Sequence, residues 1–161
     1  MRKLIAVLAG IAVLAIVNVT IYQREQLLTQ GRVVLLELAP ADPRSLMQGD
    51  YMALRFKIAA DVTQRDGGER LRDGRLVAAM DEHGVGTFKR IANGVPPAPN
   101  EVLLRYRIRN DRLKFATNAF FFQEGHAKEY APARYGEFRV AANGDMILVA
   151  MRGTDFRKLG T

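Results

Sequence analysis

The chain has 161 residues, no cysteine, two histidines and a formal net charge of +7. The absence of cysteine excludes a thiol nucleophile, a disulfide-exchange motif and any cysteine metal site. His83 and His126 lie far apart without ligand-like spacing, which argues against a zinc site, and we expect no cofactor.

The N-terminal residues 4–22 form an apolar run behind Arg2 and Lys3. Before the closing Tyr22, the only polar side chains of this run are those of Asn18 and Thr20. Roughly 19 helical residues at 1.5 Å each cross a hydrocarbon layer ~30 Å thick. No Ala-x-Ala cleavage site is present, so we interpret residues 1–23 as a retained transmembrane signal anchor, with a cleaved signal peptide as the alternative.

Basic residues at this end predict the orientation of the anchor. Arg2 and Lys3 precede the apolar run, whereas Arg24 behind it is offset by Glu25. Basic residues favour the cytoplasmic side. We therefore expect a single-pass protein of the inner (cytoplasmic) membrane with its C-terminal domain in the periplasm or another extracytoplasmic space. The anionic partner nearest to such a domain is membrane lipid, not nucleic acid.

Residues 24–31 are expected to be a polar tether, and residues 32–161 are long enough for one domain with its own core. Short runs of strand-like sequence separated by turn signals fill this domain. The expected strands are residues 33–38, 51–58, 76–80, 87–91, 101–109, 113–116, 136–140 and 146–151. The fold class is therefore mainly β, a sandwich or barrel-like domain behind a single N-terminal transmembrane helix.

The stretch DPRSLMQGDYMALRF, residues 42–56, combines a helix start, a helix stop and a β alternation. Asp42 is suited to cap a helix, Pro43 to the first helical position, and Gly49 to the left-handed residue that ends it. We expect one helical turn over residues 43–48, followed by a strand in which every second residue from Met52 points inward.

Part of this stretch, GDYMALRF, resembles the hallmark of the GDYxxLxY family of bacterial membrane-anchored proteins. The matching positions are Gly49, Asp50, Tyr51, Leu54 and Phe56, the last in place of a tyrosine. The stretches NEVLLRYRIRN and FFFQEGHAKEYAPARYGEFRV are also similar to this family. The resemblance implies an N-terminal anchor and a neighbouring multi-span membrane protein. Because the family is functionally uncharacterised, the resemblance implies no catalytic residue.

Residues 124–136, EGHAKEYAPARYG, are the densest mixture of polar and aromatic groups in the chain. We expect this segment to fold back over the run Phe120 to Phe122, in which at least one ring must point away from the core. A candidate binding pocket is formed by Asp50, Tyr51, Glu124, Glu129, Tyr130, Arg134 and Tyr135. The structural alternative is an ion-pair network that joins Arg134 to Glu124 or Asp50.

Three arginines form a candidate anion-binding strip. Arg105, Arg107 and Arg109 project from one face of the expected strand at intervals of about 7 Å. Such a row could bind phosphates or lipid headgroups. The alternative is a solvated face whose arginines pair with acids of the neighbouring strands.

The leading functional hypothesis is a non-enzymatic accessory subunit or binding module for an integral, multi-span membrane protein. Small residues of the anchor, such as Ala9 and Gly10, would let a second transmembrane helix approach closely. A sensor of anionic lipid or envelope polysaccharide, binding through the arginine strip, is an alternative.

A serine-lysine membrane protease similar to signal peptidases is the other alternative. The sequence Leu46-Met47-Gln48-Gly49-Asp50 is similar to the end of their serine box, and Lys89-Arg90-Ile91 is similar to their lysine box. However, the position of the nucleophilic serine, five residues before Leu46, is Ala41. Ser45 would have to act with Lys89 instead, which disfavours this hypothesis.

Overall fold

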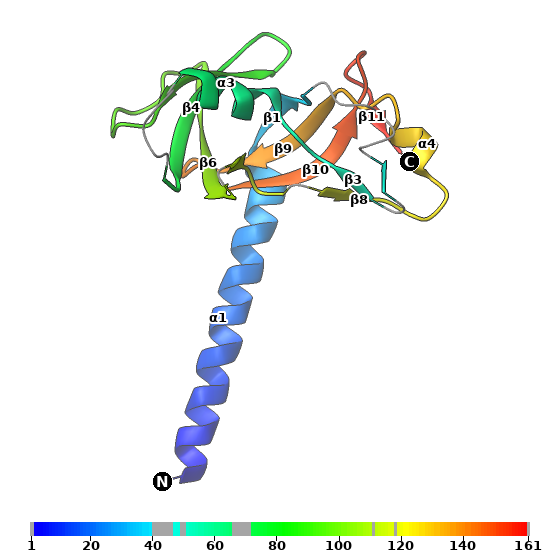
Figure 1. The fold of residues 1–161 in the computed structure, drawn as a ribbon. Coiled ribbons are helices and arrows are strands. Elements are labelled where there is room, and N and C mark those ends of the chain that lie inside the picture. Colours follow the sequence, from blue (N-terminus) through cyan, green and yellow to red (C-terminus); the bar gives the residue numbers. More distant parts are fainter. Residues whose placement is uncertain are drawn as a thin grey trace.

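The structure is a computed structural model that describes residues 2–39, 47–48, 51–65, 72–110, 112–117 and 119–160. A long helix, α1 (Arg2–Gln30), leads into a β-rich domain (Figure 1). By length and composition α1 is apolar enough to cross a membrane, and none of its most apolar stretch is buried within the protein.

The segment expected to be a tether is the last part of this helix. α1 continues to Gln30, and the Gly31 N–H donates to the Leu27 carbonyl at 3.0 Å. Leu27 is only 7 % exposed, because this end of α1 packs against the domain. Arg139 donates from Nη1 to the Gly31 carbonyl at 3.1 Å. The helix and the domain are therefore joined through packed side chains and not through a free linker.

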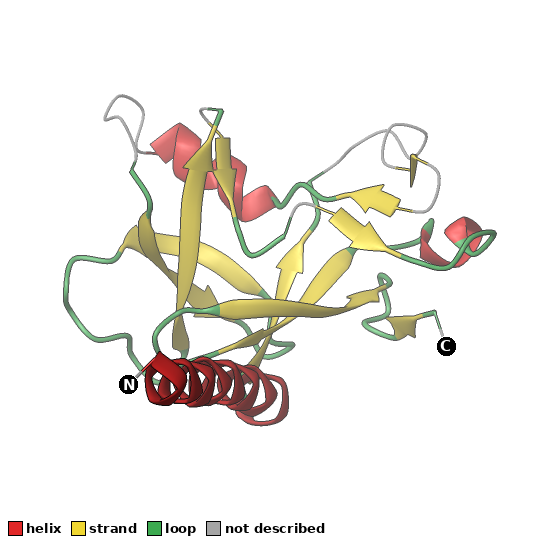
Figure 2. Cartoon of the chain, turned by 90° about the horizontal axis from the view of Figure 1, so that it is seen from below, coloured by secondary structure: helices red, strands yellow, loops and turns green. Residues whose placement is uncertain are grey.

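The domain is mainly β, and its named strand pairs are all antiparallel. One sheet has the order β1 (Arg32–Glu37), β9 (Tyr135–Val140), β10 (Met146–Arg152) and β11 (Lys158–Leu159). A second has the order β5 (Gly86–Ile91), β4 (Gly74–Met80), β6 (Glu101–Arg109) and β7 (Arg112–Lys114). The third and smallest has the order β2 (Met47–Gln48), β3 (Tyr51–Ala53) and β8 (Ala119–Phe121). A parallel bridge between Leu35 and Val85 links the first two sheets, which curl into a half-barrel (Figure 2).

The hairpins that the sequence predicts are present. β4 pairs with β5 and with β6, and β9 pairs with β10 around the Asn143-Gly144 turn. Gly144 has a φ of +89°, which a residue with a side chain rarely adopts. The bounds of β6 coincide with the predicted strand over residues 101–109.

The strand predicted over residues 51–58 is shorter than expected. β3 ends at Ala53, and residues from Lys57 onward form the helix α3 (Lys57–Arg65). Ile58 and Val62, one helical turn apart, are both buried, so the helix packs one face on the half-barrel. Met52, Leu54 and Phe56 are buried as the strand alternation predicts. The alternation does not reveal the start of the helix at Lys57, because the buried Ile58 fits both the strand alternation and the helical spacing.

The helical turn predicted over residues 43–48 is wrong at its last two residues. Met47 and Gln48 form β2 and pair with Met52 and Tyr51, because the adjacent strand offers their backbone groups hydrogen bonds that one helical turn would not. Residues 42–46, and with them Ser45, lie outside the described residues, as do Gly49 and Asp50.

The core lies between the sheets and α3, and an aromatic cluster is at its centre. Phe56 meets Phe138 edge-on at 5.3 Å between ring centroids and Phe115 at 6.0 Å. Phe138 is fully buried. The aromatic ring at the motif position occupied by Phe56 therefore points inward, as predicted. A short helix, α4 (Ala127–Tyr130), lies outside this core at the far edge of the domain (Figure 1).

Replacing the central aromatic should test this core. Phe138→Ala is expected to lower the free energy of unfolding by about 3–5 kcal/mol, because it removes a buried ring and leaves a cavity. Phe121→Ala is the matched control: Phe121 is 74 % exposed, so its loss should change stability by less than about 0.5 kcal/mol. Urea unfolding of the full chain in mild detergent, followed by circular dichroism, measures both. Equal effects would contradict the packing described here.

The joint between α1 and β1 makes a second prediction. A Cβ at Gly31 would lie 2.3 Å from the Leu27 carbonyl oxygen and 3.1 Å from the Cβ of Arg139. Gly31→Ala should therefore displace the helix end and cost about 1–3 kcal/mol in urea unfolding of the full chain. Gly10→Ala, at a position where a Cβ would meet nothing within 4 Å, is the control and should not destabilise the domain. An unchanged unfolding curve for Gly31→Ala would show that the joint is loose.

Candidate functional site

The tyrosines of the predicted pocket lie in three separate aromatic contacts. Tyr51 lies beside Phe121, with 5.8 Å between ring centroids. Tyr130, from α4, packs on the rings of Phe120 and Phe122 at 5.0 and 5.3 Å. The third tyrosine stacks on a ring from the loop before β11, in the pair Tyr135 and Phe156 at 5.0 Å. The segment after Phe122 therefore folds back as predicted, and Phe121 is the ring that stays exposed.

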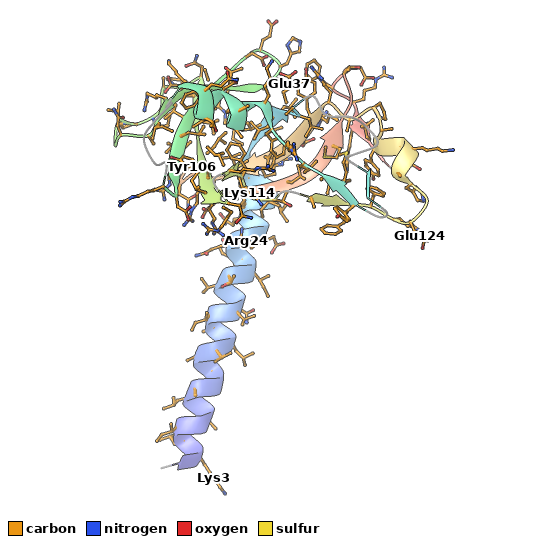
Figure 3. The ribbon with its side chains drawn as sticks, in the orientation of Figure 1. Lys3, Arg24, Glu37, Tyr106, Lys114 and Glu124 are labelled. Carbon is orange, nitrogen blue, oxygen red and sulfur yellow. The ribbon has the colours of Figure 1, made fainter. Side chains whose placement is uncertain are left out.

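The charged residues of the predicted pocket are also dispersed. Arg134 donates to Glu37 at 2.7 Å, and Glu37 also accepts from Lys57 at 3.2 Å. The predicted partner Glu124 is exposed at the edge of the domain (Figure 3). Arg134 meets Glu37 instead because the Leu38 N–H bonds to the Arg134 carbonyl, which aligns the end of β1 with this residue.

The two remaining residues of the predicted pocket are Glu129 and Asp50. Glu129 pairs locally with His126, at 2.6 Å between Oε1 and Nδ1. Asp50 lies outside the described residues. Two hollows in the described part of the chain, of about 920 and 440 Å³, are lined by other residues.

The arginine strip lies on the outer face of β6, as predicted, and the strand register extends it. Arg75 of β4 is opposite Arg105, Lys114 of β7 is opposite Arg107, and Arg112 is opposite Arg109. Directly opposed residues of antiparallel strands share a face. We call this set the basic face; its members are Arg75, Arg105, Arg107, Arg109, Arg112 and Lys114.

Two carboxylates offset part of this charge. Asp145 accepts from Arg105 at 2.9 Å, and Asp73 accepts from Arg109 at 3.2 Å. Within the described part of the chain, Arg107, Arg112 and Lys114 form no ion pair. The alternative that the strip arginines pair with neighbouring acids therefore holds for Arg105 and Arg109, but not for Arg107.

The pKa values of both carboxylates are lowered, so they remain ionised at neutral pH. For Asp73 the main cause is the hydrogen bond from the Ile108 N–H, followed by the charge of Arg109. For Asp145 the main cause of the lowered pKa is the hydrogen bond from Arg105, and the Arg24 guanidinium adds to it. Arg24 of α1 is therefore within electrostatic reach of Asp145.

A groove of about 920 Å³ lies where α1 joins the domain. One wall is the helix from Thr20 to Gln30, and the other walls are residues 97–103 and 140–145. Its lining contains both polar and apolar groups, among them the side chains of Gln23, Arg24, Leu27, Leu103 and Asn143.

Glu101 holds one wall of this groove in place. It is 5 % exposed, and its carboxylate accepts from Lys89 at 2.5 Å, from Arg90 at 3.3 Å and from the Ala98 N–H at 3.1 Å. The hydrogen bond from Lys89 is the largest cause of the lowered pKa of Glu101. Glu101 thus fixes the proline-rich loop before β6 against β5. No feature of the sequence distinguishes Glu101, because glutamate is common at outward-facing strand positions.

The protease hypothesis gains no support from the described residues. Lys89, its proposed base, lies in the ion pair with Glu101, and Ser45 is outside the described part of the chain. Among the described residues, no group of three or more side chains has the geometry to hold a metal ion.

The family relationship covers both the helix and the domain. A family model described as GDYXXLXY protein matches residues 13–151. The chain belongs to this family. No curated protein and no solved structure matches the chain significantly. The family match begins inside α1 and includes every residue that lines the groove, so the helix-domain joint lies within the family's shared region.

The lowered pKa of Glu101 makes a prediction about acid stability. The ionised carboxylate stabilises the folded state fully above its ordinary value of 4.5, and this contribution is lost as the pH falls through the lower folded-state value. Glu101→Gln should therefore unfold at lower urea than the wild type at pH 7, and the difference should shrink on acidification below about pH 4.5.

Glu82→Gln is the control for this experiment, because the Glu82 side chain is 88 % exposed. It should follow the wild type at every pH. If the difference between Glu101→Gln and the wild type stayed constant from neutral to acid pH, the carboxylate would not stabilise the groove wall through its charge.

Proposed function

We propose that the chain is a single-pass inner-membrane protein whose extracytoplasmic β domain is an accessory subunit of an integral, multi-span membrane protein. The unburied apolar surface of α1 and the two basic residues before it support the anchor and its orientation. In this arrangement residues 1–23 cross the membrane, and the domain that follows is presented at the outer surface.

The observation that carries the proposal is the groove at the helix-domain joint. The apolar run of α1 ends at Tyr22, and the groove follows the helix from Thr20 to Gln30. At 1.5 Å per residue this part of α1 rises ~15 Å, the depth of a headgroup layer and the water above it. An occupant must reach that level, as the extracytoplasmic loop or helix end of a second membrane protein does.

The lining of the groove is suited to a polypeptide. Leu27 and Leu103 contribute apolar surface, and Gln23 and Asn143 contribute amide groups that can both donate and accept. Apolar patches surrounded by hydrogen-bonding groups are typical of protein interfaces. The joint is fixed by packing, so such a partner would meet a preformed surface.

The transmembrane part of α1 supports the same proposal. A Cβ added at Gly10 would meet nothing within 4 Å, so this face is open to a second helix. The Asn18 side chain donates to the Leu14 carbonyl within α1 at 2.8 Å. Its amide thus lies along the helix, where its remaining capacity is available to a neighbour.

Site-specific photo-crosslinking tests the proposal. A photoreactive phenylalanine at Gln23 or at Ala142 would face the groove from two of its walls, and both positions are exposed. Irradiation of native membranes should join the full chain to one multi-span membrane protein, identified by mass spectrometry.

Glu82 is the control position for crosslinking. It lies in the turn between β4 and β5 and lines none of the groove walls, so it should give no such product. Equal crosslinking from Glu82, or products with lipid alone from both groove positions, would contradict the accessory-subunit proposal.

A further inference from the structure

The side of the domain from which α1 leaves is only partly covered by the helix. Figure 2 views this side directly, and α1 joins the domain near one edge. We call the uncovered area the underside. If α1 crosses a membrane as proposed above, the underside faces the bilayer surface.

One part of the underside is basic. Arg24 lies on α1 about 3 Å beyond the end of the apolar run at Tyr22. Asp145 connects it to the basic face, because this carboxylate binds Arg105 and is within electrostatic reach of Arg24. From Arg105 the basic face continues along β6 to Lys114 of β7, a strand that contacts α3.

The other part of the underside is aromatic. A hollow of about 440 Å³ is lined by Arg24 and by Phe120 and Phe121 of β8. β8 lies along the lower edge of the domain in Figure 1. Phe121 is the most exposed large apolar side chain among the described residues of the domain, with Tyr51 beside it. Its ring thus stands across a hollow from Arg24, close to the level at which the helix leaves the membrane.

We propose that the underside is a binding surface for anionic phospholipid headgroups, with the basic face taking the phosphates and the Phe121 ring entering the interfacial layer. Aromatic rings favour the membrane interface, and basic residues are attracted to anionic lipid. Among the described residues, the seven basic side chains of the basic face and Arg24 form ion pairs with two carboxylates, those of Asp73 and Asp145. The surface therefore keeps the positive charge that an anionic headgroup complements.

This inference rests on the proposed anchor but not on the protein partner. The headgroup surface consists of the basic face and β8, whereas the groove consists of α1 and two loops, with Arg24 bordering both. The two sites would act together: lipid contact would fix the tilt of the domain, and tilt would decide whether the groove meets its partner.

The chain offers a spectroscopic test because it contains no tryptophan. Phe121→Trp places a single reporter at the exposed ring. The full-length variant would be reconstituted into nanodiscs of phosphatidylcholine alone or with about 30 % phosphatidylglycerol, an anionic lipid. In the anionic discs we expect a blue-shifted emission and quenching by brominated lipid, and both should weaken in about 0.5 M salt, where surface charges are screened.

Charge variants connect this signal to the basic face. Arg107→Gln, Arg112→Gln and Lys114→Gln combined remove three charges that form no ion pair among the described residues. Each charge near anionic lipid changes the docking equilibrium about fivefold, so the triple variant should weaken it about 100-fold. The matched control, Lys128→Gln with Arg157→Gln and Lys158→Gln, removes the same charge elsewhere and should leave the signal unchanged.

The outcomes separate this inference from the proposed function. Equal quenching in both kinds of nanodisc, or an equal loss in the two triple variants, would overturn headgroup binding. Unquenched emission in discs that contain the inserted chain would overturn it too. Failure of the chain to co-elute with the discs would instead refute the anchor. Quenching in these partner-free discs together with failed crosslinking in native membranes would retain the lipid surface and reject the accessory subunit.

Discussion

The packing of the last turns of α1 against β9 and β10 is the constraint on which the rest of the arrangement depends. Leu27 is buried there, Gly31 allows the helix to turn directly into β1, and Arg139 binds the Gly31 carbonyl. A flexible linker would let the domain rotate over the helix. The packed joint instead gives the groove, the basic face and β8 fixed positions relative to the helix axis.

Glu101 has the same importance on the other side of the groove. A loop with three prolines has few backbone donors with which to attach itself to the sheet. The Glu101 carboxylate uses one of the donors that remain: it accepts from the Ala98 N–H, and Lys89 and Arg90 donate to it from β5. A nearly buried carboxylate is tolerated because it is surrounded by donors. The charged hydrogen bonds of Glu101 thus hold the proline-rich loop in place, which its few backbone donors would not do alone.

The structure also shows where part of the net charge of +7 is concentrated. The sequence alone leaves open whether the excess basic residues are dispersed over a solvated surface or form a patch that binds a partner. The register of β4, β6 and β7 gathers six of them on one outer face. Two carboxylates with lowered pKa values neutralise only part of it. The exposed Phe121, which shares a hollow with Arg24, is the reason that we propose a lipid headgroup and not a soluble anion as the ligand.

The sequence by itself determined the features that follow from local periodicity: the apolar helix, the mainly β class, the hairpins, the outward arginines of β6 and the family motif. It could not determine the partner of Arg134, the switch to α3 at Lys57 or the role of Glu101. Those depend on which segments meet across the domain: Glu37 and Arg134 are 97 positions apart and become neighbours only when β1 pairs with β9. The groove likewise exists only in three dimensions, because its walls come from three distant parts of the chain.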